Sequence, residues 1–198
     1  MSDIEIRTCE LGDLRVESRG VSRVIRGHAI VFDKLSENLG GFREKIAPSA
    51  VDRTLQDGID LRALVDHDSA RLIGRTSAGT LRVEKDGQGL RVEIDPPETT
   101  AGQDIVESIR RRDTTGMSFA FKVMPDGDDW DFKVDPPVRT VTDMLVREVS
   151  IVTWPAYPQT SVALRSLAAR QQSTKSGGYP KTIAERLRVQ QARAAGWR

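Results

Sequence analysis

The chain contains only one cysteine, Cys9, and two histidines in 198 residues. A single cysteine cannot form an internal disulfide framework, so we expect a reducing compartment such as the cytosol. Two histidines are too few for a zinc site built from three histidine ligands. No apolar run approaches the ~18 residues that a membrane helix needs, and the N-terminus lacks the basic and apolar regions of a signal peptide. We therefore expect neither membrane insertion nor secretion.

Net charge is also nearly absent, at +1, so the whole molecule has no strong attraction for nucleic acid or acidic lipid. The charge is unevenly placed, because residues 168–198 carry seven basic residues and one acid, Glu185. Only Tyr179 and Trp197 are aromatic in that segment, so a base-stacking platform is not expected there. We predict an N-terminal extension (1–20), one domain (21–167) and a basic, partly flexible tail (168–198) with a short helix after Pro180.

Strand patterns predominate between the two ends of the chain. They cover residues 21–32, 61–65, 80–84, 90–95, 117–123 and 138–153, and the last is long enough for two strands. One helix is predicted from Pro48 to Gln56, and a second begins at Thr100, with Gln103 completing a capping box. The fold class is therefore mainly β with few helices, most simply a closed barrel.

His67 lies at the end of an apolar strand, in an Asp-His-Asp turn. A histidine at a strand end is accessible for proton exchange, and imidazoles titrate near neutral pH, which suits a general base. The alternative is a surface histidine in a polar turn.

Ser118 follows a helix-to-strand turn and alternates with the bulky residues Met117, Phe119 and Phe121. Such a strand could hold a hydroxyl rigidly, but a serine needs a nearby base to become a nucleophile. The residues around it do not form a G-x-S-x-G elbow, because Ala120 stands at the place of the second glycine. The alternative is a small polar residue on the outer face of a strand.

Glu148 interrupts an otherwise apolar strand, where a carboxylate is costly without a partner. It could orient a histidine ring, as the acid of a Ser-His-acid triad does, or form a salt bridge with Arg147 or Lys122. His28 is interpreted as structural, and Cys9 is not expected to be a nucleophile. A metal site from His28, His67, Asp66 and Asp68 matches no compact metal motif, so no metal or cofactor is predicted.

Six segments, in their order along the chain, resemble the prohead maturation proteases of tailed phages. They are GHAIVFD (27–33), GGFREKIAPSAVDRTL (40–55), LRALVDHD (61–68), IGRTSAGTLRVEKDGQGLRVEID (73–95), GMSFAFKV (116–123) and REVSIVTWPAYPQTSVALRS (147–166). The resemblance extends from about Arg26 to Ser166. It implies a relationship to the herpesvirus assemblins and a compact β-barrel surrounded by helices.

The resemblance also implies a serine endopeptidase that cleaves scaffold and capsid proteins inside the assembling prohead, in the host cytoplasm. It places a histidine–serine pair on His67 and Ser118. The third member in assemblins is a later histidine, but no histidine follows His67 here. Glu148 falls in the corresponding strand and is our choice, with Asp66 and Asp68 as alternatives.

Expected partners are therefore the major capsid protein and the scaffold. Assemblins are active as pairs, so a homo-oligomer is compatible with the resemblance, whereas membrane and nucleic-acid partners are not expected. The basic tail could recruit the protease to an acidic scaffold surface, and its Lys and Arg residues offer sites for self-cleavage. The rival interpretations are a catalytically silent internal scaffold protein and a metal-dependent hydrolase built on His67.

Overall fold

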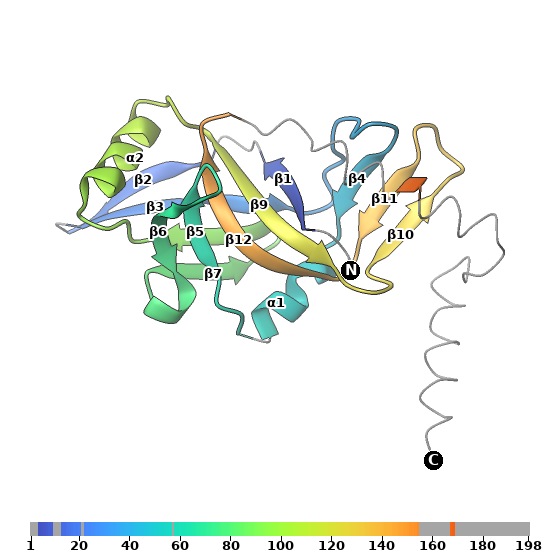
Figure 1. The fold of residues 1–198 in the computed structure, drawn as a ribbon, viewed down its shortest axis with the longest axis horizontal. Coiled ribbons are helices and arrows are strands. Elements are labelled where there is room, and N and C mark those ends of the chain that lie inside the picture. Colours follow the sequence, from blue (N-terminus) through green and yellow to red (C-terminus); the bar gives the residue numbers. More distant parts are fainter. Residues whose placement is uncertain (1–3, 10–12, 21, 57, 155–166, 169–198) are drawn as a thin grey trace, which may run out of the picture.

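The computed structural model describes residues 4–9, 13–20, 22–56, 58–154 and 167–168 (Figure 1). The strands are β1 (Glu5–Cys9), β2 (Arg15–Arg19), β3 (Ser22–Val31), β4 (Arg43–Ile46), β5 (Arg62–Val65), β6 (Asp68–Arg75), β7 (Leu81–Lys85), β8 (Gly89–Ile94), β9 (Gly116–Val123), β10 (Asp128–Asp131), β11 (Val138–Val141) and β12 (Met144–Val152). Two α-helices, α1 (Asp52–Gln56) and α2 (Thr100–Arg110), accompany them, with short 3-10 helices at Pro48–Val51 and Thr76–Ala78. The prediction of a mainly β fold with few helices is confirmed, whereas the predicted helix after Pro180 lies outside the described residues.

The strands form three sheets. The five-stranded sheet has the order β1-β9-β12-β5-β6, the four-stranded sheet β2-β3-β8-β7, and the three-stranded sheet β10-β11-β4. Residues of the two larger sheets share one apolar core, in which Ile30 and Val92 of one sheet join Phe121 and Val149 of the other. The two sheets therefore bury their apolar faces by packing as layers.

The expected closed barrel surrounded by helices is wrong for the part of the chain that the structure describes. Each of the three sheets is open and ends in two edge strands, which in the five-stranded sheet are β1 and β6. Layered packing already removes the apolar faces from water, so closure of one sheet on itself is not needed to form the core. Among the described residues, no helix is long and apolar enough to cross a membrane.

The N-terminal strands pair with the body of the molecule. In β1, Thr8 lies opposite Ser118 of β9, and in β2, Arg19 lies opposite Ser22 of β3. The predicted division of the chain at residue 20 therefore falls inside the β2–β3 hairpin. Pairing of β1 with β9 makes Ser118 an interior position of its sheet rather than a position on an outer strand.

The two predicted helices are present, with a correction to one boundary. The first begins as a 3-10 turn at Pro48 and continues as α1. The N-cap of α2 is Thr99, not the predicted Thr100, because the Thr99 side chain accepts a hydrogen bond from the Gly102 N–H. The two threonines are adjacent and equally suited by type, so the sequence could not distinguish them.

Candidate active site

Three side chains meet above the five-stranded sheet, and the ring of His67 lies between the other two. Its Nε2 lies 2.8 Å from the hydroxyl oxygen of Ser118, and its Nδ1 lies 2.5 Å from Oε1 of Glu148. The structure thus brings together the three residues that the sequence analysis selected, from positions up to 81 residues apart.

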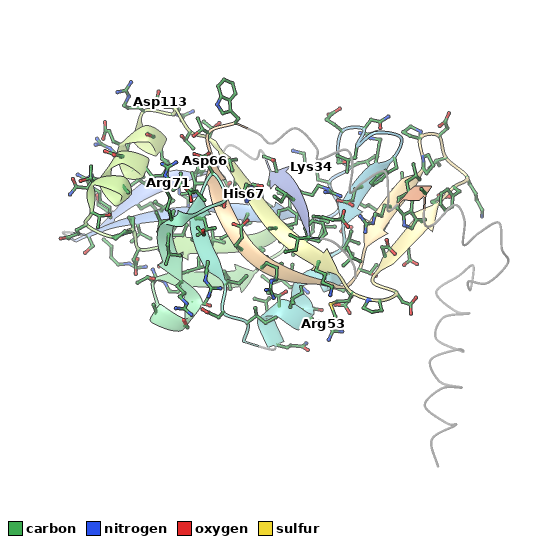
Figure 2. All side chains as sticks on the ribbon, in the orientation of Figure 1. Lys34, Arg53, Asp66, His67, Arg71 and Asp113 are labelled. Atoms are coloured by element: carbon green, nitrogen blue, oxygen red, sulfur yellow. The ribbon has the colours of Figure 1, made fainter. Side chains whose placement is uncertain are left out.

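The hairpin turn between β5 and β6 positions His67 (Figure 2). Val65 pairs with Asp68, so Asp66 and His67 form a two-residue turn in which their φ angles are 52° and 60°. Two-residue hairpin turns favour positive φ, and aspartate and histidine tolerate it better than most residues. The Asp66 N–H donates to the carbonyl oxygen of Ile151 at 2.9 Å, which fixes this turn beside the end of β12.

Strand register positions the other two residues. Ser118 lies opposite Ser150, and Glu148 lies opposite Ala120, across the antiparallel β9–β12 pair. The register shifts between Val146 and Glu148, and irregularities of this kind turn the following side chains to a new direction. Parallel pairing of β12 with β5 then places Glu148 on the same side of the sheet as the His67 turn.

The hydrogen-bonding capacities of the groups determine how this chain of contacts works. An ionised carboxylate only accepts hydrogen bonds, so His67 Nδ1–H donates to Glu148. A neutral imidazole with its proton on Nδ1 has Nε2 free to accept the Ser118 proton. A nucleophile, a base and a group that orients the base are arranged in this way in serine hydrolases.

Ser118 has no exposed surface, whereas the side chains of His67 and Glu148 are 21% and 14% exposed. The Ser118 hydroxyl also lies 2.9 Å from the backbone carbonyl oxygen of Arg7, in β1. The sequence analysis did not anticipate this contact, because no pattern within residues 4–9 indicates pairing with a strand more than 100 residues later.

A buried cluster of charged side chains holds β1 in place. It lies on the side of β1 opposite to Ser118. Arg7 bonds Glu5 at 2.6 Å and Glu44 at 2.8 Å. Arg139 bonds Glu5 at 2.8 Å, Glu44 at 2.9 Å and Asp128 at 2.9 Å. Burial alone would raise the pKa of Glu5, but the two guanidinium groups outweigh it and hold that pKa below its ordinary value. The cluster connects β1 to β4, β10 and β11.

The two aspartates considered as alternatives to Glu148 have other partners. Asp66 accepts hydrogen bonds from Arg71 at 2.9 Å and from the Thr153 N–H at 2.8 Å. The side chain of Asp68 accepts from the Ala70 N–H at 2.8 Å. Asp66, His67 and Arg71 are neighbours in Figure 2, but Glu148 is the carboxylate that bonds the histidine ring. The second oxygen of Glu148 accepts from Ser150, so the two oxygens bond His67 and Ser150 rather than the alternative partners Arg147 and Lys122.

His28 belongs to a separate cluster. Its Nδ1 lies 2.5 Å from Asp13 and its Nε2 lies 2.9 Å from Asp86, so both ring nitrogens have carboxylate partners. Burial alone would lower the pKa of His28, but these two carboxylates outweigh it and raise the pKa. The structure does not bring His28 to His67, and within the described ranges no three His, Cys, Asp or Glu side chains are placed to hold a metal ion.

A hollow of about 390 Å³ lies beside β1. It is lined mainly by residues of β1, of β4 and of the segment between β3 and β4. Cys9 contributes to its wall, whereas His67, Ser118 and Glu148 do not. The hollow nevertheless borders the site, because its lining includes Thr8, which pairs with Ser118, and Phe119, the next residue of β9.

Comparisons with known proteins agree with this arrangement. The model of the caudovirus prohead serine protease family matches residues 10–175. Among solved structures, the chain is similar to the bacteriophage T4 capsid assembly protease, gp21, with a TM-score of 0.55 and 12% sequence identity, over 77% of this chain and 98% of that one. A search of curated proteins found no match. The resemblance noted in the sequence is confirmed: the chain belongs to the caudovirus prohead serine protease family, and is a serine protease of capsid maturation.

Proposed function

We propose that Ser118 is the nucleophile of an endopeptidase, His67 its general base and Glu148 the residue that orients the base. The observation that carries this proposal is the His67 ring, which lies 2.8 Å from the Ser118 hydroxyl and 2.5 Å from the Glu148 carboxylate. Family membership supports the reaction class, and the geometry supports the choice of residues.

In the proposed reaction, Ser118 Oγ forms a bond to the scissile carbonyl carbon and its proton passes to His67 Nε2. The C–N bond then breaks, and His67 delivers the proton to the leaving amine. A water molecule attacks the acyl-enzyme, gives a proton to His67, and displaces Ser118, which regains its proton. Glu148 remains ionised and stabilises the imidazolium that forms twice in this cycle.

The natural substrates that fit this protease are the scaffold and capsid proteins of the assembling prohead, together with its own chain. The similar solved structure is that of a capsid assembly protease, and this likeness supports such a class of substrate. Because Ser118 is fully buried, a peptide carbonyl reaches it only after neighbouring groups move. A protease that is closed until assembly begins would be protected from premature cleavage of the scaffold.

The test compares purified wild-type chain with Ser118→Ala by intact mass and by labelling with a fluorophosphonate probe. The control is Ser18→Ala, since Ser18 is exposed on β2. Shortening and labelling of wild type and Ser18→Ala, but not of Ser118→Ala, would support the proposal. If Ser118→Ala shortens like wild type, another nucleophile acts. If wild type neither shortens nor labels, the same comparison is made in proheads assembled with capsid and scaffold proteins, where wild type that still does neither would support a silent scaffold protein.

A further inference from the structure

We propose that Ser150 is a positioning residue of this active site, which holds the Glu148 carboxylate in the orientation that His67 requires. The inference rests on the proposed roles of His67, Ser118 and Glu148. The Ser150 hydroxyl lies 2.6 Å from Oε2 of Glu148, while Oε1 of the same carboxylate lies 2.5 Å from His67. The contacts form one continuous chain from Ser150 through Glu148 and His67 to Ser118.

The direction of the hydrogen bond follows from chemistry. The carboxylate of Glu148 can only accept, so Ser150 must donate its proton to Oε2. The terminal torsion of a glutamate side chain is broad and weakly restrained on its own. With a donor at each oxygen the plane of the carboxylate is fixed, and Oε1 stays directed at His67. The Ser150 hydroxyl donates to Glu148 and not to His67 or Ser118, so in this scheme it acts through Glu148.

Strand geometry explains why residue 150 serves this purpose. Residues two apart on a strand share a face, so Glu148 and Ser150 lie on the same face of β12. Ser150 also lies directly opposite Ser118 on β9, and both serines are fully buried. Their hydrogen bonds distinguish them, because Ser118 bonds His67 whereas Ser150 bonds Glu148.

A buried hydroxyl is costly unless it has a partner. Ser150 stands in an apolar run of β12, between Val149 and Ile151, where an alanine or valine would avoid that cost. The bond to Glu148 offsets the cost, and Glu148 itself gains the second donor that a partly buried carboxylate needs. Their mutual hydrogen bond and the contact of Glu148 with His67 therefore explain why Ser150 and Glu148 stand in this apolar strand.

The first measurement follows the His67 ring directly and does not depend on turnover. Ser150→Thr and Ser150→Val give side chains of matched shape that differ in the hydroxyl. The imidazole N–H proton of His67, assigned by its loss in His67→Ala, is recorded by NMR in each variant. We expect Ser150→Thr to keep the wild-type resonance and Ser150→Val to shift it. The imidazole protons of His28, which has different partners, should not move.

The second measurement is the labelling rate with a fluorophosphonate probe. Ser150→Val should lower the maximal labelling rate about 10- to 100-fold, the size of effect seen when a residue that orients a metal ligand is lost. The half-saturating probe concentration should stay unchanged, because the surface that binds the probe is intact. Ser150→Thr should restore most of the rate. In a Glu148→Ala background, Ser150→Thr and Ser150→Val should label equally slowly, since Ser150 acts through Glu148.

Equal rates and equal resonances for the threonine and valine variants would overturn the inference. So would a Ser150→Val effect of the same size with and without Glu148. If the branched side chains prevent folding, Ser150→Ala, compared at matched thermal stability, replaces Ser150→Val in both measurements. If Ser118→Ala labels as fast as wild type, the proposed function fails, but the His67 resonance still decides whether Ser150 holds Glu148.

Discussion

The hydroxyl of Ser118 donates a hydrogen bond to the backbone carbonyl oxygen of Arg7, 2.9 Å away. The same hydroxyl lies 2.8 Å from Nε2 of His67, and it carries a single proton. A proton held by the Arg7 carbonyl is not available to His67. In the proposed mechanism, β1 therefore competes with the base for the Ser118 proton and restrains the reactivity of this serine.

Weakening the Arg7 carbonyl as an acceptor should therefore activate Ser118. Replacement of the Arg7–Thr8 amide by an ester gives a poorer acceptor, and Cys9, the single cysteine, allows ligation of a synthetic 1–8 segment. We expect labelling by a fluorophosphonate to rise about two- to fivefold, as for the loss of a hydrogen bond of roughly 0.5–1 kcal/mol. The control is the same ligated chain with its amide intact, and slower labelling of the ester would show that the Arg7 contact does not compete.

Replacement of His67 should cost more activity than replacement of its carboxylate partner. His67→Ala removes the base and should lower the rate roughly 10⁶-fold. Glu148→Gln keeps the size of the side chain but loses the charge, and should lower the rate about 10⁴-fold. Peptide hydrolysis or probe labelling measures both. Asp66→Asn is the matched control, because Asp66 bonds Arg71 and Thr153, and a larger loss there would transfer the third role to Asp66.

Stability should depend on pH through His28. Asp13 and Asp86 raise the pKa of His28, so the folded state favours the charged ring. This stabilisation is complete below the ordinary histidine pKa of about 6.5 and is lost as pH rises through the raised pKa. We expect the free energy of unfolding, measured with urea from about pH 6 to about pH 9, to fall more steeply in wild type than in His28→Gln. Parallel curves would contradict this role.

Asp86, in the same cluster, determines how far stability is retained as pH falls. Burial alone would raise the pKa of Asp86, but its bonds to His28 and to two backbone N–H groups lower that pKa to about 2. The contribution of Asp86 is therefore present above its ordinary pKa and is lost only as pH falls toward about 2.

The buried charge cluster should be far more sensitive to mutation than a surface ion pair. Arg139→Met leaves Glu5 and Glu44 with Arg7 as their cation and removes the ion pair of Asp128, and should lower the free energy of unfolding by about 3–5 kcal/mol. Urea unfolding measures the loss. Arg110→Met, which breaks the exposed pair with Glu107, should cost less than about 0.5 kcal/mol. Similar losses for the two variants would show that the cluster does not anchor β1.

Much of the strand content could be predicted from local patterns, but the architecture could not. Alternation in 117–123 predicted β9, and the run at 138–153 became β11 and β12. The strands β1, β2, β4, β6 and β10 were missed. In β1 and β4 the reason is that charged residues such as Glu5, Arg7 and Glu44 do not resemble buried strand positions. Their charges are neutralised by one another in the fold, which depends on contacts between distant segments.

The candidate site was accessible to sequence reasoning for a different reason. His67 in its turn and Glu148 in an apolar strand are both unusual for their surroundings, and such departures point to function. Only the alternative interpretation placed Ser118 on the outer face of a strand; in the structure it is fully buried, in a strand paired with β1 on one side and β12 on the other. Ser150 was missed because its proposed role depends on the orientation of one carboxylate, which no sequence pattern encodes.

Pairing between distant strands also determines when the site can form during synthesis. Ser118 needs β1 from the beginning of the chain and β12 from residues 144–152, and His67 needs Glu148, 81 residues later. Contacts of such sequence separation form late in folding. A nascent chain that has emerged only as far as β9 therefore lacks Glu148, the carboxylate that bonds the His67 ring in the folded protein.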